Sequence, residues 1–495
     1  MKNSALILFL MLILLFGCTE RKHQKAAASL HFSLNNSMLQ NPVALIHIED
    51  CYNLFFRYSV DGGLKQWGKA RSKDLVHWNY NLVNVAFGNV GGQNIKTVVV
   101  DRNQTSAYSS ESPALIAFST SANQFGKLEL LYSADNGLIW KQDEVNEILL
   151  ADFYEPVQDV KVIWNDDLQK WIMLTLSGYE VRFYSSDNLI NWEYLNRFGD
   201  DVYLKTGEWT SLDFFPMEVE GSHEIKWILF ISADSGSPNE GSGVQYFVGD
   251  FDGFVYQASH NKPKWIDHGS DLYQAVVLSD YLSENKPPVL IGSIYNSIYE
   301  KFNINSDSLI EFSLARQLTL KEEFNDYYLI AVPVNTIDTI EKEKEKIAKT
   351  ELTDGKQVGK KIQLPVRIDL NFSVNNRLYL GMAEAFGAKI KNSKGEELIL
   401  GYQTERRYFY IAEPSIQKKF PDSWDGFNYA PYVTNDALMD MTLIIDKNSA
   451  ELFAMNGLIS LSRKFNFNGE SAQLQLFGEK GTVSLQEGTI TEFRK

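Results

Sequence analysis

The stretch "FYSSDNLINW" (183–192) decides the fold, because it repeats the pattern of "ARSKDLVHW" (70–78) and "LYSADNGLIW" (131–140). Each copy has a Ser-x-Asp turn followed by a tryptophan, and each follows an alternating stretch typical of a β-strand. We therefore expect hairpins in which the aspartate caps a turn and the tryptophan packs behind it. All-β units of this size are arranged radially in β-propellers. The alternative is a β-sandwich with coincidental turns.

The repeats belong to the longer of two predicted domains, both of them all-β. Strand-like alternation runs through residues 30–335, which we predict to be the propeller. Residues 336–357 are rich in charge and poor in aromatic residues, which indicates an exposed linker. Alternating strands then resume over 358–495, where we predict a smaller β-sandwich.

The composition limits the classes of partner. A chain of 495 residues with 44% apolar residues can bury a large core. A formal net charge of −16 argues against nucleic acid or an anionic membrane surface as the main partner. A sugar is not disfavoured by this charge, so a saccharide remains compatible.

The N-terminus indicates targeting rather than structure. "ALILFLMLILLF" is an apolar run too short to span a bilayer, and it leads into "GCTE". A small residue directly before Cys18 resembles a bacterial lipoprotein signal. We therefore predict a signal peptide over 1–18, acylation of Cys18 and a polar tether over 19–29, which places the protein at the cell envelope. The alternative is an ordinary secretory signal with an incidental cysteine. Cys51 would then be the one cysteine left, which leaves no intrachain disulfide.

The chemistry available to the chain is that of carboxylates and aromatic rings. P-loop, dinucleotide-binding, zinc-protease and nucleophile-elbow motifs are missing from the sequence, and the seven histidines are scattered. We therefore expect neither a metal nor a cofactor. Carboxylates and aromatic side chains on a β scaffold are typical of saccharide sites, where hydrolysis generally needs two carboxyl groups.

Several of these stretches resemble one known family, glycoside hydrolase family 32, whose invertases, levanases and inulinases cleave β-fructosides. The resemblance runs from about residue 30 to the C-terminus. It is carried by "WGKARSKDLVHW", "VKVIWNDDLQKWIMLTLSG", "VRFYSSDNLINWEYL", "GSGVQYFVGDFDG" (241–253) and, in the second domain, "FGAKIKNSKGEELILGY" and "IIDKNSAELFAMNG" (444–457). It implies a five-bladed propeller followed by a β-sandwich, with the site at the propeller axis.

The resemblance also assigns three catalytic positions. The nucleophile's place falls in "MLQNPVA", where Asn41 stands for the family's aspartate. The stabiliser's place is Asp159, which is kept, although its flanking arginine is replaced by Gln158. The acid/base position is Thr210 in "GEWTSLDFFP" (207–216). An amide is a poor nucleophile and a hydroxyl a poor acid near neutral pH, so the ordinary reaction is not expected.

Other positions that the resemblance places in the pocket also differ. The glutamine of one family strand is Arg57, the glycine of a Phe-Ser-Gly motif is Lys96, and a tryptophan is Ser293. Tyr273 is kept. For binding we expect Arg57 and Gln158 to serve hydroxyl groups and Trp67 and Tyr273 to stack on a sugar face, with blade core as the alternative for Trp67. Arg57 and Lys96, if both face the pocket, would favour an anionic group on the ligand.

Three functions stay open. The favoured one is non-catalytic binding of an oligo- or polysaccharide, with a fructan as the expected class, at the cell envelope. The second is a glycosidase with altered catalytic residues, pairing Asp159 with Glu208, Asp213 or Glu155. In a regular strand Glu208 shares a face with Thr210 and lies about 7 Å from it, whereas Asp213 points the opposite way. The third is a structural or interaction protein of an envelope complex.

Overall fold

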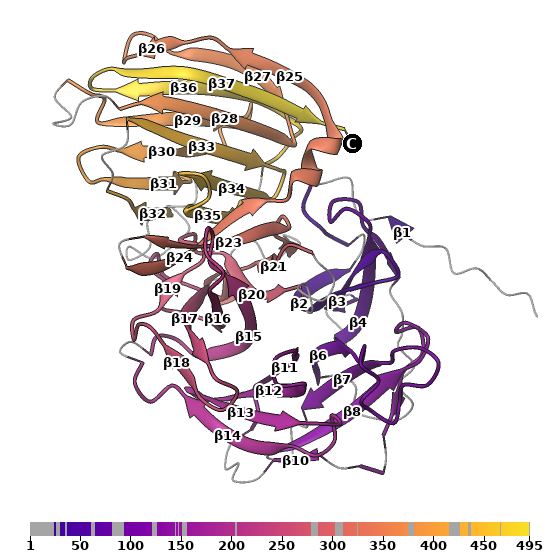
Figure 1. Cartoon of the computed structure of the whole chain (residues 1–495). Coiled ribbons are helices and arrows are strands. Elements are labelled where there is room, and N and C mark those ends of the chain that lie inside the picture. The colour runs from indigo at the N-terminus through magenta and orange to yellow at the C-terminus, as the bar shows by residue number, and fades with distance from the viewer. Residues whose placement is uncertain are drawn as a thin grey trace, which may run out of the picture.

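The computed structural model describes residues 24–25 and 30–494, with gaps at 35–36, 61–64, 82–93, 121–125, 144, 147, 151–155, 203–204, 279–285, 302–309, 324, 375–380, 415–425, 434–436 and 466. Figure 1 shows two parts, a ring of sheets and, above it, a pair of stacked sheets. The chain is a five-bladed β-propeller followed by a β-sandwich. Among the described residues, no helix is long and apolar enough to cross a membrane.

Five sheets form the ring, and each is built from one continuous stretch of chain. The first sheet contains β1 (Gln24–Lys25), β5 (Asn79–Asn81), β4 (Lys65–Ser72), β3 (Cys51–Ser59) and β2 (Met38–Ile48). The second contains β10 (Ile148–Leu149), β8 (Lys127–Ser133), β7 (Leu115–Thr120) and β6 (Ile95–Val100), with β9 (Lys141–Gln142) on β8. The third contains β11 (Asp159–Asn165), β12 (Lys170–Ser177), β13 (Glu180–Ser186) and β14 (Glu193–Phe198).

The last two sheets of the ring follow the same plan. The fourth contains β15 (Trp209–Glu218), β16 (Ile225–Ala233), β17 (Gly243–Phe251) and β18 (Tyr256–Ala258), with β19 (Lys264–Trp265) on β17. The fifth contains β20 (Leu272–Val277), β21 (Val289–Ile294), β23 (Arg316–Glu323) and β24 (Asp326–Pro333), with β22 (Glu311–Phe312) on β21. The short helix α1 (Ser297–Lys301) follows β21.

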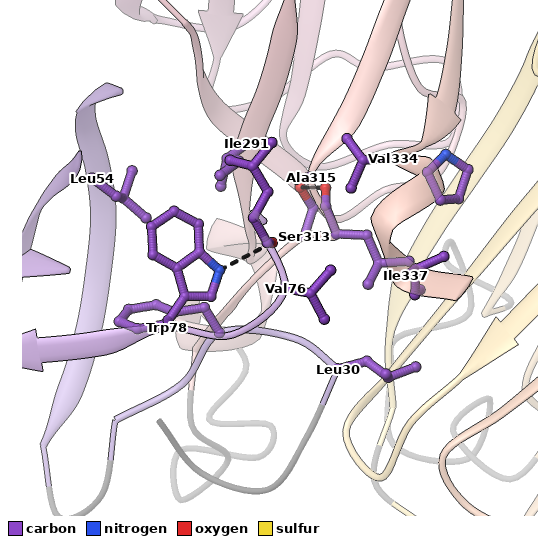
Figure 2. A pocket seen from close by; sticks show the side chains of 13 residues that line it. Leu30, Leu54, Val76, Trp78, Ile291, Ser313, Ala315, Val334 and Ile337 are labelled. Carbon is purple, nitrogen blue, oxygen red and sulfur yellow. Dashed lines mark hydrogen bonds between the residues drawn. The ribbon is translucent and has the colours of Figure 1, made fainter. Parts of the chain in front are cut away.

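The first long strand of each sheet lies at the axis of the ring. Strands β2, β6, β11, β15 and β20 contact one another in that order, and β20 returns to β2, which closes the ring. Pairing between first and last blade is limited to one isolated bridge, Leu45 to Leu278, among the described residues. The ring is therefore closed mainly by side chains. Figure 2 shows this seam, where Leu54 and Trp78 of the first blade face Ile291 of the last.

The repeated turns form as predicted in the first two copies. Oδ1 of Asp74 accepts hydrogen bonds from the N–H groups of residues 76 and 77, and Oδ1 of Asp135 from those of residues 138 and 139. In the third copy the register differs by one residue, since Asn188 rather than Asp187 accepts the N–H groups of residues 190 and 191. Asparagine offers the same acceptor oxygen as aspartate, so the turn is kept. Trp192 Nε1 then donates to Leu189 O at 3.1 Å.

The sandwich has a seven-stranded and a six-stranded sheet. The first contains β25 (Glu341–Ile347), β37 (Val483–Phe493), β28 (Val366–Ser373), β33 (Leu438–Ile445), β34 (Ser449–Ala454) and β35 (Ile459–Lys464), with β26 (Thr350–Leu352) on β37. The second contains β27 (Val358–Gln363), β36 (Ser471–Glu479), β29 (Ala385–Lys391), β30 (Glu397–Gln403), β31 (Tyr408–Ala412) and β32 (Phe427–Pro431).

Much of the segment expected to be a linker belongs to this sandwich. After the 3₁₀ helix η2 (Asn335–Ile340), strands β25 and β26 both pair with β37, near the C-terminus. The sequence "EKEKEKI" has the charge of an exposed segment because β25 is an edge strand, and lysines on edge strands discourage pairing with other chains. Its partner β37 lies near the other end of the domain, a pairing that local sequence cannot reveal.

A buried ionic network joins propeller to sandwich. His31 lies between Asp446 (Nδ1–Oδ2 3.3 Å) and Glu451 (Nε2–Oε1 3.0 Å). Arg316 of β23 contacts Glu451 (Nη2–Oε2 2.9 Å) and Asp267 (Nη1–Oδ2 2.8 Å), and its side chain is fully buried. Burial alone would lower the pKa of His31, but hydrogen bonds to the two carboxylates raise it to about 10. The imidazole is therefore a buried cation.

Candidate functional site

A pocket opens at the axis of the ring, between the inner strands of the blades. Its volume, including the part open to solvent, is about 450 Å³. The wall contains both polar and apolar residues. The lining residues are Asn41, Pro42, Val43, Arg57, Ile95, Lys96, Asp159, Lys161, Thr210, Ser211, Leu212, Asp213, Gln274, Ala275 and Val276.

Irregular strands shape this wall. In β2 the ladder shifts register on both sides of Pro42, which has no N–H to give to a neighbouring strand. Ser293 Oγ donates to Gln40 O at 3.0 Å and so satisfies a carbonyl of the irregular segment. Asn41 is half-buried, and its Nδ2 donates to Pro42 O at 3.0 Å.

A second irregularity changes the faces of β15. The ladder shifts between Trp209 and Ser211, so Thr210 is the bulged residue. Around this bulge the four consecutive residues Thr210, Ser211, Leu212 and Asp213 all line the pocket. The expectation that Thr210 and Asp213 point to opposite faces applies to a regular strand, and the bulge removes that condition. Ser211 Oγ is also on the wall, buried and without a hydrogen-bond partner among the described atoms.

Asp159 and Lys96 form a loose ion pair. Asp159 is almost fully buried, and its Oδ2 accepts the N–H of Leu212 at 2.9 Å. Its Oδ1 lies 3.9 Å from Lys96 Nζ, longer than a hydrogen bond. Burial raises the pKa of Asp159 to about 6, although Lys96, the Leu212 N–H and Arg57 act against the rise. Burial also lowers the pKa of Lys96 to about 8, against the attraction of Asp159.

Arg57 stands beside Lys96 and is held by its neighbours. Its Nη2 donates to Asn94 Oδ1 (2.9 Å) and to Ile95 O (3.0 Å), and its guanidinium lies over the ring of Trp67 at 5.4 Å. Trp67 is buried in a core cluster and is not a lining residue of the pocket. This placement matches the alternative given for Trp67, blade core, and adds cation–π support for Arg57.

The hydroxyl of Thr210 both donates and accepts a hydrogen bond within the protein. It donates to Ser232 O at 3.2 Å and accepts from the hydroxyl of Tyr273 at 2.7 Å. Tyr273 is buried, it lies behind Thr210 rather than among the lining residues, and burial raises its pKa to about 12. Its hydroxyl therefore keeps its proton at neutral pH and orients Thr210.

The carboxylate of Asp213 is fully occupied by the protein. Its oxygens accept from Lys161 Nζ (2.9 Å and 3.0 Å), from Phe214 N (2.7 Å) and from Val277 N (2.9 Å). Both partners of the ion pair are buried. The pair ties β11, β15 and β20 together at the axis, and this explains a buried aspartate without assigning it to chemistry.

The remaining predicted residues lie at the rim or beyond the described part of the chain. Glu208 is exposed, and its Oε1 accepts from Gln158 Nε2 at 3.0 Å, while Gln158 Oε1 accepts from Gly178 N at 2.8 Å. Neither side chain lines the pocket. Glu155, like Cys18, lies outside the described residues.

The structure thus brings together Asn41, Arg57, Asp159 and Thr210, and it adds residues that sequence reasoning missed. Lys161 is the main addition, and a signal for it was present: it lies two positions after Asp159, so it shares a strand face with it. Gln274 and Ser211 had no such signal, because their exposure depends on irregular strands. No cluster of three or more metal-binding side chains occurs in the described part of the chain.

Comparison with protein-family models covers nearly the whole fold. The model described as the glycosyl hydrolases family 32 N-terminal domain matches residues 31–333, and the model of the C-terminal part matches residues 335–492. The boundary between the two lies where the last blade ends and η2 begins.

Individual relatives agree with these matches. A levanase of Bacillus subtilis is 27% identical over 477 residues, covering 94% of this chain and 70% of the levanase. A levanbiose-producing levanase of the same organism is 26% identical, and the match covers 94% of this chain and 90% of the length of that levanase. The fold resembles that of exo-inulinase from Aspergillus awamori, with a TM-score of 0.81 and 21% identity over 95% of this chain and 99% of that one. The structure of fructofuranosidase from Schwanniomyces occidentalis, complexed with fructose, also gives a TM-score of 0.81. It is 24% identical, and the match covers 94% of this chain and 98% of that one.

Proposed function

Because the chain belongs to glycosyl hydrolase family 32, we propose that its axial pocket binds a saccharide without hydrolysing it. A fructan or β-fructoside is the expected class, since levanases are among the relatives. The single observation that carries the proposal is that Asn41 and Thr210, an amide and a hydroxyl, both line the pocket, and the family resemblance assigns to these two residues the places of the carboxyl groups that hydrolysis needs.

The other carboxylates of the site do not replace the missing ones. Asp213 accepts hydrogen bonds from Lys161 and two N–H groups, so its oxygens are occupied by the protein and are not available to a ligand. Glu208 is exposed at the rim and bonded to Gln158. Among the described lining residues, Asp159 is therefore the one carboxylate left for a ligand.

Several polar groups of the wall suit a sugar. Ser211 Oγ and Arg57 Nε are buried and have no hydrogen-bond partner among the described atoms. Buried polar groups without partners are costly, and ligand hydroxyl groups or water would relieve that cost. The amide of Asn41 adds a donor and an acceptor of neutral charge.

A second candidate, a glycosidase with altered catalytic residues, is favoured by the environment of Asp159. Because burial raises the pKa of Asp159 to about 6, part of the population carries a proton near neutral pH, as a general acid requires. Glu155, one of its conceivable partners, lies outside the described residues.

One experiment separates these candidates. The mature chain is incubated with sucrose, inulin, levan and a wider glycan panel, and both sugar release and binding by calorimetry are measured. We expect binding in the micromolar range without release. Release that disappears in Asp159→Ala, and persists in the control Asp187→Ala on an exposed turn of the same blade, would overturn the proposal in favour of the glycosidase. Neither binding nor release would point to a structural role in an envelope complex.

We further propose that the protein is held at a bacterial envelope by a lipid on Cys18. Support comes from the sequence alone, the apolar run before "GCTE". Cys18→Ser is expected to move the protein from the membrane to the soluble fraction. The matched control is Cys51→Ala, because Cys51 is buried within the first blade. A Cys18→Ser protein that stays with the membrane would contradict lipidation.

A further inference from the structure

One side of the axial pocket is basic. Arg57 and Lys96, from β3 and β6, both line it, which is the arrangement expected to favour an anionic ligand. Arg57 donates hydrogen bonds to Asn94 and Ile95, the two residues directly before Lys96, so the two cations are held next to each other across two blades. The basic side is therefore a built feature of the wall.

The charges of the described wall do not balance. Lys161 and Asp213 neutralise each other at 2.9 Å. Asp159 is left to face both Lys96 and Arg57, and the 3.9 Å to Lys96 Nζ leaves the ammonium protons free of a close acceptor among the described residues. A partly buried cation without a full partner is unfavourable unless something anionic joins it. This excess is notable in a chain with a net charge of −16.

The departures from the family motifs shift the charge in one direction. By the family resemblance, Asn41 and Thr210 each stand in the place of a carboxylate, and Arg57 and Lys96 each stand in the place of a neutral residue. Gln158 is the one change of opposite sign. Loss of catalytic residues alone does not explain two cations at the same pocket, whereas a change to an anionic ligand does.

We propose that the axial pocket binds a saccharide that carries an acidic substituent, a carboxylate or a sulfate ester, placed between Arg57 and Lys96. This rests on the proposed function, which makes the pocket a saccharide site, and adds the charge class of the ligand. Guanidinium and ammonium groups form strong hydrogen bonds with such anions. Asn41 fits this ligand, because an aspartate at that position would repel the acidic group.

The affinity should depend on pH in a way that a neutral sugar would not show. The groups that face Lys96 are Asp159 of β11, Arg57 of β3 and Lys65 of β4. Those that face Asp159 are Lys96, Arg57 and the hydroxyl of Tyr273 from β20. Protonation of Asp159 below about pH 6 removes the negative charge, and deprotonation of Lys96 above about pH 8 removes a positive one. Affinity for the anion should therefore fall in two steps as the pH rises from about 5 to about 9.

The test compares three arms by calorimetry on the mature chain. These are a galacturonate oligosaccharide (carboxylate), a chondroitin sulfate oligosaccharide (sulfate ester) and neutral oligosaccharides from inulin and levan, each at low and high salt. At least one acidic arm should bind tenfold or more tightly than the neutral arm and weaken at high salt. Lys96→Met should lower that affinity about tenfold or more. Lys356→Met, an exposed lysine of the sandwich, is the matched control and should leave it unchanged.

The outcomes separate this inference from the proposed function. Equal or tighter binding of the neutral arm, unchanged in Lys96→Met, overturns the inference and leaves saccharide binding intact. Acidic binding that survives in Lys96→Met places the ligand elsewhere and also overturns it. Absence of binding in all arms by a chain whose thermal melt is normal overturns both. Arg57→Met serves as a second variant, checked by the same melt.

Discussion

Replacing Arg316 by methionine removes the central cation of the propeller–sandwich junction while keeping a long apolar side chain. Arg316 is fully buried and donates to Asp267, Glu451 and Ser462. Each charge-assisted hydrogen bond contributes about 1.5–3 kcal/mol, so two carboxylates give a loss of about 3–6 kcal/mol. Removal of one partner from a buried ion pair costs about 3–5 kcal/mol, which agrees with this range. We expect the free energy of unfolding to fall by about 3–5 kcal/mol.

The assay is urea unfolding followed by tryptophan fluorescence and circular dichroism. Arg197→Met is the control, because Arg197 is half-exposed and pairs with Glu180 and Asp200 on the surface; its loss should stay below about 1 kcal/mol. Burial raises the pKa of Asp267, but Arg316 and hydrogen bonds reverse this and hold it below its usual value. Without Arg316 this carboxyl takes up a proton, so the loss should be smaller at pH 5 than at pH 8. A loss no larger than that of Arg197→Met would refute the reasoning.

Three further outcomes are expected. The pKa of His31 is raised to about 10, so its stabilising charge is fully present below pH 6.5 and is lost as the pH rises through 10. His31→Gln should therefore lower the free energy of unfolding most at pH 6 and hardly at all near pH 10. Urea titrations at both pH values measure this difference. Thr210→Val removes the acceptor of the Tyr273 hydroxyl and should cost about 1 kcal/mol, measured by thermal melting. Gly207 has φ +63° and an added Cβ would overlap Ser235 O, so Gly207→Ala should cost more than about 1 kcal/mol in the same melt, and equal stability would contradict this turn geometry.

The part of the fold that repeats in sequence was predictable, and the part held by distant pairing was not. Three of the five blades carry the Ser-x-Asp…Trp pattern, so the radial arrangement follows from residues such as Asp74 and Asp135. The other two blades lack it, and their number came only from the family resemblance. Strand β25 was taken for a linker because its partner β37 lies at the opposite end of the domain.

The site was predictable as a set of positions but not as a set of contacts. Asn41, Asp159 and Thr210 were placed by motifs, and all three line the pocket. The opposite faces expected for Thr210 and Asp213 apply to a regular strand, and β15 is irregular at the bulge beside Trp209. Of the two roles expected for Trp67, sugar stacking and blade core, its burial in a core cluster and its contact with Arg57 match the second. A bulge and a cation–π contact both depend on neighbouring strands, which local sequence does not identify.

The hydrogen bond from Leu30 to Asp446 joins residues 416 positions apart, and His31 reaches Glu451 over 420. The N-terminal segment that carries Leu30 and His31 therefore finds its final partners only after nearly the whole chain has been synthesised. Leu30 also lines the seam between the first and last blades, so its contact with Asp446 lies beside that seam. A chain interrupted before β34 would therefore lack Glu451, the sandwich partner of His31, although the contacts between β20 and β2 that close the ring would all be present.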